Sequence, residues 1–222
     1  MPLAPPYPDQ EALAELGALV RARLAEDPEI YRVPADAAEL FAIGEFFTPA
    51  ECERLMGMID AVARPSQLHD VAYVSKFRTS YSGNFEAHDP FILAVSRRID
   101  DVLGIPSEWG ETLQGQRYLP GQEFKPHCDW FYPDQPYWPK EEVRGGQRSW
   151  TAMAFLNSVE EGGHTHFTEL GISIEPKPGA LLIWNNARPD GSPNEATIHA
   201  GTPVGRGVKY VLTKWYRTRD FC

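Results

Sequence analysis

The stretch QRYLPGQEFKPHCD, residues 116–129, decides how the rest of the chain is interpreted. Its last residues read as the end of a strand, in which side chains two positions apart point to the same side. His127 and Asp129 can therefore face one common point while Cys128 faces away from it. An imidazole and a carboxylate presented together can supply half of a metal site, so the remaining ligand must come from another segment.

A second histidine lies in TIHAGTPVGRGVKYV, residues 197–211, a segment that is apolar and strand-like. Two histidines and one carboxylate form the facial triad that leaves positions open for other ligands on non-haem Fe(II). We therefore expect His127, Asp129 and His199 to form a metal site. A closed zinc site is the main chemical alternative, and it would need a fourth protein ligand. His164 and His166 are available for it, although a solvated or core-edge pair explains them more simply.

Lys209 lies on what reads as the strand after His199, between apolar neighbours. A lysine in such a strand is costly to bury unless it meets a negative partner. The carboxylate of a bound cosubstrate would satisfy it, whereas a side chain that reaches solvent would need no ligand.

The composition describes an ordinary globular chain. Its 222 residues fit one domain, and 42% of them are hydrophobic and 23% charged. The 31 acidic and 21 basic residues leave a net charge of −10, which argues against a nucleic-acid partner. Residues 1–10 lack the order of a signal peptide and no apolar run approaches 18 residues, so we expect a cytoplasmic protein without a membrane partner. The sequence does not predict an oligomeric state.

The N-terminal half is predicted to be mainly helical. Apolar residues recur at helical spacing over 10–26 and 89–103. Thr48 and Glu51 form a capping-box pattern before a helix over 52–62, and residues 71–81 read as a strand.

The second half is predicted to be a β-sandwich. Short apolar or alternating runs are separated by turn residues, and they predict strands over 112–119, 123–131, 148–157, 164–167, 171–175, 180–185, 195–201 and 207–217. About eight short strands indicate a double-stranded β-helix, the jelly roll of the cupin type. We expect an α+β fold in a single domain, residues 1–222, with a lead-in and helix over 1–36, a support region over 37–111 and the jelly-roll core over 112–218.

Longer segments of the chain resemble the Fe(II)- and 2-oxoglutarate-dependent dioxygenases, in particular the catalytic domain of the prolyl 4-hydroxylase alpha subunit. The similar segments follow one another in the family's order and cover residues 113–217. They are RYLPGQ leading to His127-x-Asp129, Arg148-x-x-Thr151 leading to FLN at 155–157, EGGHTHF at 161–167, PGALLIWN at 178–185, and HAGTPVGRGVKY at 199–210 leading to TKW at 213–215.

This resemblance implies a function and a set of site residues. His127, Asp129 and His199 would hold Fe(II), and Lys209 would pair with the distal carboxylate of 2-oxoglutarate. The hydroxyls of Tyr118 and Thr165 would assist Lys209. The implied reaction consumes O2, converts 2-oxoglutarate to succinate and CO2, and hydroxylates a substrate, with ascorbate as a candidate reductant.

The resemblance also points to a substrate side of the pocket. Arg148 and Trp215 match positions that line it in prolyl 4-hydroxylases, which favours a peptidyl proline or a similar protein side chain. Phe124 stands where those enzymes commonly carry tyrosine, and Arg217 where a histidine is common. The aromatic segment 130–139 is either a loop that grips a peptide over the mouth or a rigid cover. The alternatives are the same chemistry on a free amino acid or small metabolite, and a non-catalytic cupin-like binding module.

Overall fold

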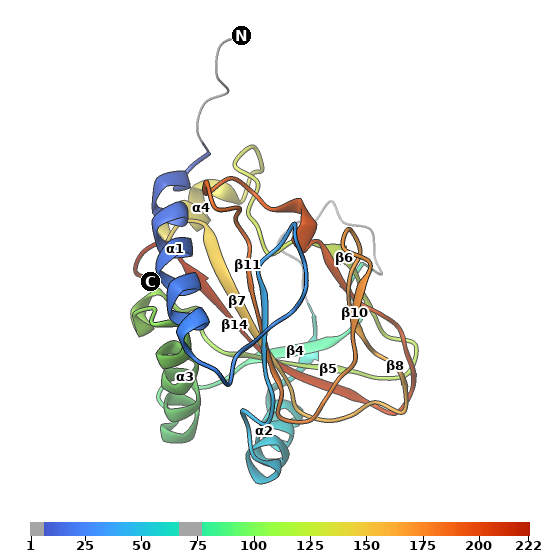
Figure 1. Ribbon diagram of the computed structural model, residues 1–222. Coiled ribbons are helices and arrows are strands. Elements are labelled where there is room, and N and C mark those ends of the chain that lie inside the picture. Colours follow the sequence, from blue (N-terminus) through green and yellow to red (C-terminus); the bar gives the residue numbers. More distant parts are fainter. Residues whose placement is uncertain (1–6, 67–76) are drawn as a thin grey trace.

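The computed structural model describes residues 7–66 and 77–222. Three helices, α1 (Gln10–Glu26), α2 (Pro49–Val62) and α3 (Pro90–Leu103), lie against one side of a large antiparallel sheet (Figure 1). A fourth helix, α4, spans Trp138–Val143, and 3-10 turns span Ser107–Trp109 and Glu195–Thr197. Within the described ranges, no helix is long and apolar enough to cross a membrane.

Two antiparallel sheets form the β-sandwich. The large sheet has the order β1-β2-β11-β7-β14-β5-β4-β3, and the small one has the order β10-β9-β12-β6. Strands β8 (Glu161–Gly162) and β13 (Val204–Arg206) pair separately. The large sheet consists of Tyr31–Arg32 (β1), Leu40–Ile43 (β2), Leu181–Asn185 (β11), Arg148–Phe155 (β7), Lys209–Arg217 (β14), Gln114–Tyr118 (β5), Tyr81–Asn84 (β4) and Arg64–Pro65 (β3). The small sheet consists of Ile172–Ile174 (β10), Thr165–Phe167 (β9), His199–Gly201 (β12) and Phe124–His127 (β6).

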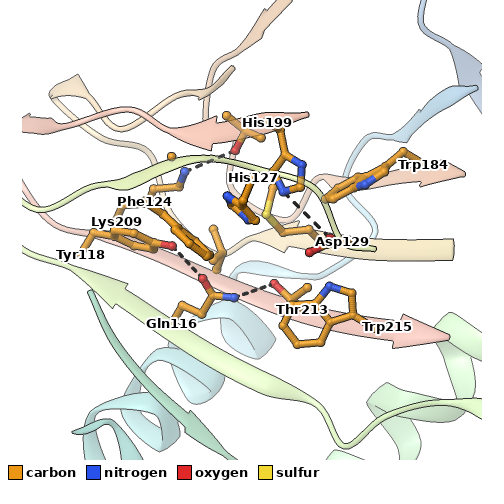
Figure 2. A pocket seen from close by; sticks show the side chains of 14 residues that line it. Gln116, Tyr118, Phe124, His127, Asp129, Trp184, His199, Lys209, Thr213 and Trp215 are labelled. Atoms are coloured by element: carbon orange, nitrogen blue, oxygen red, sulfur yellow. Dashed lines mark hydrogen bonds and ion pairs between the residues drawn. The ribbon is translucent and has the colours of Figure 1, made fainter. Parts of the chain in front are cut away.

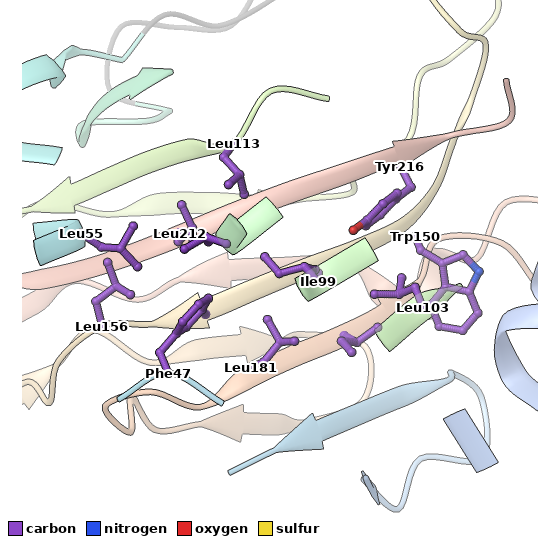
Figure 3. Close-up of a cluster of buried hydrophobic side chains, with 14 of the residues drawn as sticks. Phe47, Leu55, Ile99, Leu103, Leu113, Trp150, Leu156, Leu181, Leu212 and Tyr216 are labelled. Atoms are coloured by element: carbon purple, nitrogen blue, oxygen red, sulfur yellow. The ribbon is translucent and has the colours of Figure 1, made fainter. Parts of the chain in front are cut away.

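The two faces of the large sheet bury two different cores. One face packs on the helices through side chains that include Leu55, Ile99, Leu181 and Leu212 (Figure 3). The other face packs toward the small sheet through a second set: Tyr118, Met153, Phe155, Phe167, Leu182, Trp184 and Val211. Successive residues of β7 and β11 alternate between the two cores, as the period of an extended strand requires. The predicted α+β jelly-roll class is confirmed.

Strand β14 shows the same alternation with charged side chains. Lys214 points to the helices, where its Nζ donates a hydrogen bond of 2.6 Å to Ser96 Oγ and contacts Asp100. Tyr216 Oη also donates to Asp100, at 2.7 Å. Lys209, Thr213 and Trp215 line the cavity on the opposite face. One strand therefore carries both the helix packing and part of the site.

The sequence expectations hold at the start of α2 and differ from the structure at the ends of two strands. Helix α2 begins with the expected capping box, in which Glu51 N donates to Thr48 Oγ1 and Thr48 N donates to Glu51 Oε2. The strand expected over 123–131 ends at His127, and the strand expected over 195–201 begins as a 3-10 turn because Asn194 caps it. The aromatic segment continues into α4, with Pro139 in the helix's first turn, where proline is tolerated. Most of the strand expected over 71–81, and His69, lie outside the described residues.

Candidate metal and cosubstrate site

Three side chains that could hold a metal ion meet in the small sheet. His127 and His199 lie directly opposite each other on β6 and β12, and Asp129 follows β6 at a bend. One ligand atom from each lies within 4.8 Å of the other two. His199 Nε2 lies 3.9 Å from Asp129 Oδ2, and Figure 2 shows the three side chains turned toward one region. Among the described residues, no other group of three His, Cys, Asp or Glu side chains is placed in this way.

The backbone sets the tautomer of both histidines. His127 Nδ1 lies 2.8 Å from the carbonyl oxygen of Lys125, and His199 Nδ1 lies 2.9 Å from that of Thr197. Because a carbonyl only accepts, each Nδ1 carries the proton and each Nε2 lone pair is free for a metal. Burial, with a smaller contribution from the charge of His199, lowers the pKa of His127 to about 3. The His127 imidazole is therefore neutral at pH 7, which is the form that binds metal.

The Asp129 carboxylate is held by a short hydrogen-bond chain. Thr151 Oγ1 donates to Asp129 Oδ2 at 2.9 Å, and Asn186 Nδ2 donates to Thr151 Oγ1 at 3.0 Å. Burial raises the pKa of Asp129, but the neighbouring imidazole of His199 and the guanidinium group of Arg148 outweigh burial and hold it below its usual value. Asp129 is thus an oriented, ionised carboxylate.

Replacing Thr151 with valine tests this chain. The change keeps the shape but removes the hydroxyl that orients Asp129, so we expect metal affinity to fall about tenfold, the lower end of the range for groups that support ligands. Titration with Co(II), followed by its visible absorption, measures the effect. Ser149→Ala is the matched control on the same strand, because the Ser149 hydroxyl donates to the carbonyl of Tyr216. Equal Co(II) affinity of wild type and Thr151→Val would contradict the role given to Thr151.

A cavity of about 390 Å³, part of which is open to solvent, adjoins the three side chains. Lys209 enters it from β14 and is only 2% exposed. Lys209 Nζ donates to Thr165 Oγ1 at 3.3 Å, and no carboxylate of the described residues pairs with it. Burial lowers the pKa of Lys209 to about 7. A buried ammonium without a counter-charge fits an anionic ligand.

Polar groups beside Lys209 complete this end of the cavity. Tyr118 lies opposite Lys209 on β5, and its hydroxyl donates to Gln116 Oε1 at 2.8 Å. Gln116 Nε2 donates in turn to Thr213 Oγ1 at 3.1 Å (Figure 2). The Thr165 hydroxyl accepts from Lys209 Nζ, and the Tyr118 ring centroid lies 5.5 Å from the same atom. Both predicted residues therefore lie near the lysine, and their roles toward a cosubstrate stay predictions. The sequence analysis missed Gln116 and Thr213. Alternation along a strand could have indicated both, because Gln116 lies on the same face of β5 as Tyr118, and Thr213 on the same face of β14 as Lys209.

The four residues predicted on the substrate side fall into two groups. Phe124 and Trp215 line the cavity, and the Phe124 ring stacks on His127 with centroids 3.6 Å apart. Arg148 and Arg217 do not line it, because Glu111 accepts hydrogen bonds from both guanidinium groups. Glu111 carried no motif that could have revealed it in the sequence.

The remaining histidines in the described ranges lie apart from the site. His164 Nδ1 is 3.2 Å from Ser173 Oγ, and His166 faces Ala200 and Ser173 as a cross-strand neighbour. His88 is exposed. Neither His164 nor His166 joins the three candidate ligands, so nothing in this part of the chain supports a closed four-ligand zinc site.

Comparisons with known proteins agree with this site. The sequence pattern of the 2OG-Fe(II) oxygenase superfamily matches residues 113–217. Prolyl 4-hydroxylase 1 of Arabidopsis thaliana is 35% identical over 206 residues, covering 81% of this chain and 69% of that protein.

Two solved structures share the fold. The viral collagen prolyl hydroxylase from Paramecium Bursaria Chlorella virus-1, in complex with 2OG, aligns with a TM-score of 0.62 at 26% identity, covering 79% of this chain and 94% of that one. A prolyl hydroxylase from Trichoplax adhaerens, in complex with a hypoxia inducible factor peptide fragment, aligns with a TM-score of 0.61 over 94% of this chain and 91% of that one. Its identity of 14% shows the fold alone.

The chain belongs to the 2OG-Fe(II) oxygenase superfamily and is a homologue of the prolyl 4-hydroxylases. It is a 2-oxoglutarate-dependent dioxygenase, and this class of enzyme uses Fe(II), 2-oxoglutarate and O2. The side chains fit these groups, since two imidazoles with free Nε2 atoms and an ionised carboxylate converge beside a buried lysine without a counter-charge. The predicted family, the enzyme class and the cofactors Fe(II), 2-oxoglutarate and O2 are confirmed, whereas the use of ascorbate and the roles of individual residues stay predictions.

Proposed function

We propose that the protein hydroxylates a prolyl side chain within a peptide, using His127, Asp129 and His199 to hold Fe(II). When bound, Fe(II) with 2-oxoglutarate and O2 supplies the oxidising power for hydroxylation, and 2-oxoglutarate leaves as succinate and CO2. The observation that carries the proposal is the cavity itself, in which these three side chains, Lys209, Phe124 and Trp215 face one space.

The chain's own residues bind and orient the reactants. Lys209 supplies a compact positive charge for the far carboxylate of 2-oxoglutarate, and Thr165 and Tyr118 offer hydroxyl groups to the same end. The apolar side chains of Val211 and Met153 also line the cavity, where they limit the number of water molecules around the cosubstrate. Phe124 and Trp215 present aromatic faces, which suit the apolar ring of proline.

Peptides are the proposed partners. The homologues are named prolyl 4-hydroxylases, and the Trichoplax adhaerens structure holds a peptide fragment. Of the nitrogens of Arg148, Nε and Nη2 donate to Glu111, whereas Nη1 lies 3.9 Å from Asp129 Oδ1 and makes no hydrogen bond to the described residues. Arg148 stands beside the cavity and not in its lining, so this donor is suited to a carbonyl of a peptide that passes next to Asp129.

Mass spectrometry tests the substrate. The protein is incubated with Fe(II), 2-oxoglutarate, ascorbate and one of three probes, which are a (Pro-Pro-Gly)5 peptide, poly-L-proline and free L-proline. We expect a peptide to gain one oxygen atom on a prolyl ring in step with succinate release, and its alanine-substituted analogue to gain none. Hydroxylation of free proline alone would overturn the peptide assignment, and cosubstrate-dependent ligand binding without any succinate release would indicate a binding module.

Cosubstrate affinity should depend on pH through Lys209. Its pKa in the free protein is about 7, and a bound carboxylate favours the protonated form, so binding takes up a proton above that pH. We expect constant affinity for 2-oxoglutarate below pH 7 and a loss approaching tenfold per pH unit above it. Calorimetry on Mn(II)-loaded protein between pH 6 and 9, in buffers of different ionisation enthalpy, measures both affinity and proton uptake.

The control for this experiment is Lys209→Arg. An arginine keeps its charge over the whole range, so affinity in that variant should not fall as the pH rises. Uniform wild-type affinity across the range, without proton uptake, would contradict the assignment of Lys209 as a group that titrates in the free protein.

A further inference from the structure

Arg217 at the end of β14 uses its guanidinium group to join three parts of the chain. Its Nε donates to Glu111 Oε1 at 2.6 Å, its Nη2 to Glu141 Oε2 on α4 at 2.7 Å, and its Nη1 to the carbonyl of Gly146 at 2.6 Å. The side chains of Arg217 and Glu141 are each 1% exposed. Arg217 therefore cannot contact a substrate directly, although its position in the sequence predicted that it lies on the substrate side of the pocket.

Glu111 connects this group to the site. Its two oxygens accept Nε and Nη2 of Arg148 at 2.6 and 2.8 Å, the bidentate geometry that fixes a guanidinium plane. Arg148 Nη1 lies 3.9 Å from Asp129 Oδ1. Side chains of alternating charge thus form a chain from the candidate metal ligand to helix α4. In order, they are Asp129, Arg148, Glu111, Arg217 and Glu141.

The segment 130–147, which begins directly after Asp129, is fixed by the same residues. The Phe131 ring lies within 4.8 Å of the Arg148 guanidinium carbon and 4.6 Å of that of Arg217. The Phe131 backbone is also held at both polar atoms, because its N donates to Gln147 Oε1 at 2.8 Å and its carbonyl accepts from Gln147 Nε2 at 2.7 Å.

Two glycines in the turn after α4 allow its backbone to lie against the Arg217 side chain. Gly145 and Gly146 have φ angles of 120° and 76°, which favour glycine. A Cβ on Gly145 would lie 3.1 Å from Arg217 Cγ, so the close approach also needs the missing side chain.

A buried ion pair contributes little net stability, since desolvation of two charges offsets most of their attraction. What the Arg217 fork supplies is geometry, because three hydrogen bonds from one rigid plane fix β14, α4 and Glu111 relative to one another. Arg148 is then held in one orientation, with its guanidinium carbon 4.2 Å from the ring centroid of Trp215 and 4.8 Å from that of Phe131.

We propose that Arg217 and Glu141 are positioning residues that hold segment 130–147 as a fixed wall of the site and thereby orient Arg148 toward a peptide. This rests on the proposed function in that the oriented group serves a peptide substrate. Under this proposal, the aromatic segment 130–139 is a rigid cover and not a loop that moves to grip a peptide.

The test variant is Glu141→Gln, and the matched control is Asp100→Asn. Asp100 forms the other buried pair of β14, with Lys214, on the face of the strand that points away from the site. In Glu141→Gln we expect faster hydrogen exchange in segment 130–147 and a rise of about tenfold in the KM for (Pro-Pro-Gly)5, with 2-oxoglutarate affinity within twofold of wild type. In Asp100→Asn, exchange in that segment and the peptide KM should stay at wild-type values.

A second variant, Arg217→Lys, keeps the charge but loses the three-way fork, and it should reproduce the effects of Glu141→Gln. If both site variants exchange in segment 130–147 as slowly as wild type, or if Asp100→Asn raises the peptide KM equally, the proposal is overturned. Hydrogen exchange does not depend on turnover. A wild-type protein that left every peptide unmodified would reject the proposed function, while the exchange result would still decide whether the pair fixes the wall.

Discussion

Replacing His199 with alanine is expected to abolish succinate formation, with activity at least about 10³-fold below wild type. The change removes one of the three candidate metal ligands, and no other histidine of the described residues can replace it, since His164 and His166 lie outside the group. Loss of one donor also weakens metal binding, because the remaining imidazole and carboxylate cannot enclose one side of the ion. Succinate release at saturating Fe(II) and 2-oxoglutarate measures the effect.

The controls for this variant are His164→Ala and His166→Ala. Both remove a partly exposed histidine from the same region of the chain, and both should keep wild-type turnover. Activity of His199→Ala above one tenth of wild type would mean that this histidine is not a metal ligand, and loss of activity in His164→Ala would support the closed-site alternative.

Replacing Lys209 with methionine should have opposite effects on stability and on cosubstrate binding. Methionine fills a similar volume without a buried charge, so the ligand-free protein should gain about 1–4 kcal/mol in free energy of unfolding. Affinity for 2-oxoglutarate should fall at least about 100-fold, because a desolvated carboxylate loses the cation that lines the cavity beside it. Thermal unfolding and calorimetric titration measure the two effects, and metal affinity should change far less.

The pH dependence of the stability gain has a definite sign. Lys209 has a pKa of about 7 in the folded protein against 10.5 in the unfolded chain, so the unfolded state binds more protons between these values. The cost of burying the charge is therefore complete at and below pH 7 and declines as pH rises above it. The stability difference between Lys209→Met and wild type should shrink in the same direction.

Lys214→Met is the matched control, because Lys214 is equally buried but is paired with Asp100. Its removal leaves the Asp100 carboxylate buried without its cation, with only the hydroxyls of Tyr216 and Ser107 donating to it. It should therefore destabilise the protein by about 3–5 kcal/mol while 2-oxoglutarate affinity is retained. If Lys209→Met bound the cosubstrate as tightly as wild type, the role of Lys209 would have to be abandoned.

The residues that meet at the centre of the site could be predicted from sequence. His127 and Asp129 stand two residues apart at the end of one predicted strand and His199 stands in another, and a bound metal ion accounts for all three together. Lys209 is costly in such a strand unless a ligand needs its charge. The strand period explained only part of the arrangement, since Asp129 lies at a bend past the end of β6 and not within the strand.

The supporting groups could not be predicted, because they depend on contacts between distant segments. Thr151 reaches Asp129 across the two sheets, and Glu111 joins two arginines that lie far from it in sequence. No periodicity reports such a pairing. The partners of Arg217 were missed for the same reason. Its position in the sequence predicted the substrate side of the pocket, but not the buried carboxylates to which it donates. The cytoplasmic location and the domain boundaries stay predictions.

The parts of the candidate site come from two different sheets. The three candidate metal ligands belong to the small sheet and the bend beside it, whereas Lys209 and Tyr118 come from the large sheet. A partly folded chain in which the small sheet has formed alone could capture the ion, but it could not complete the anion pocket. Both binding sites are therefore complete only when the two sheets are packed together, so binding of 2-oxoglutarate reports that the sandwich has formed.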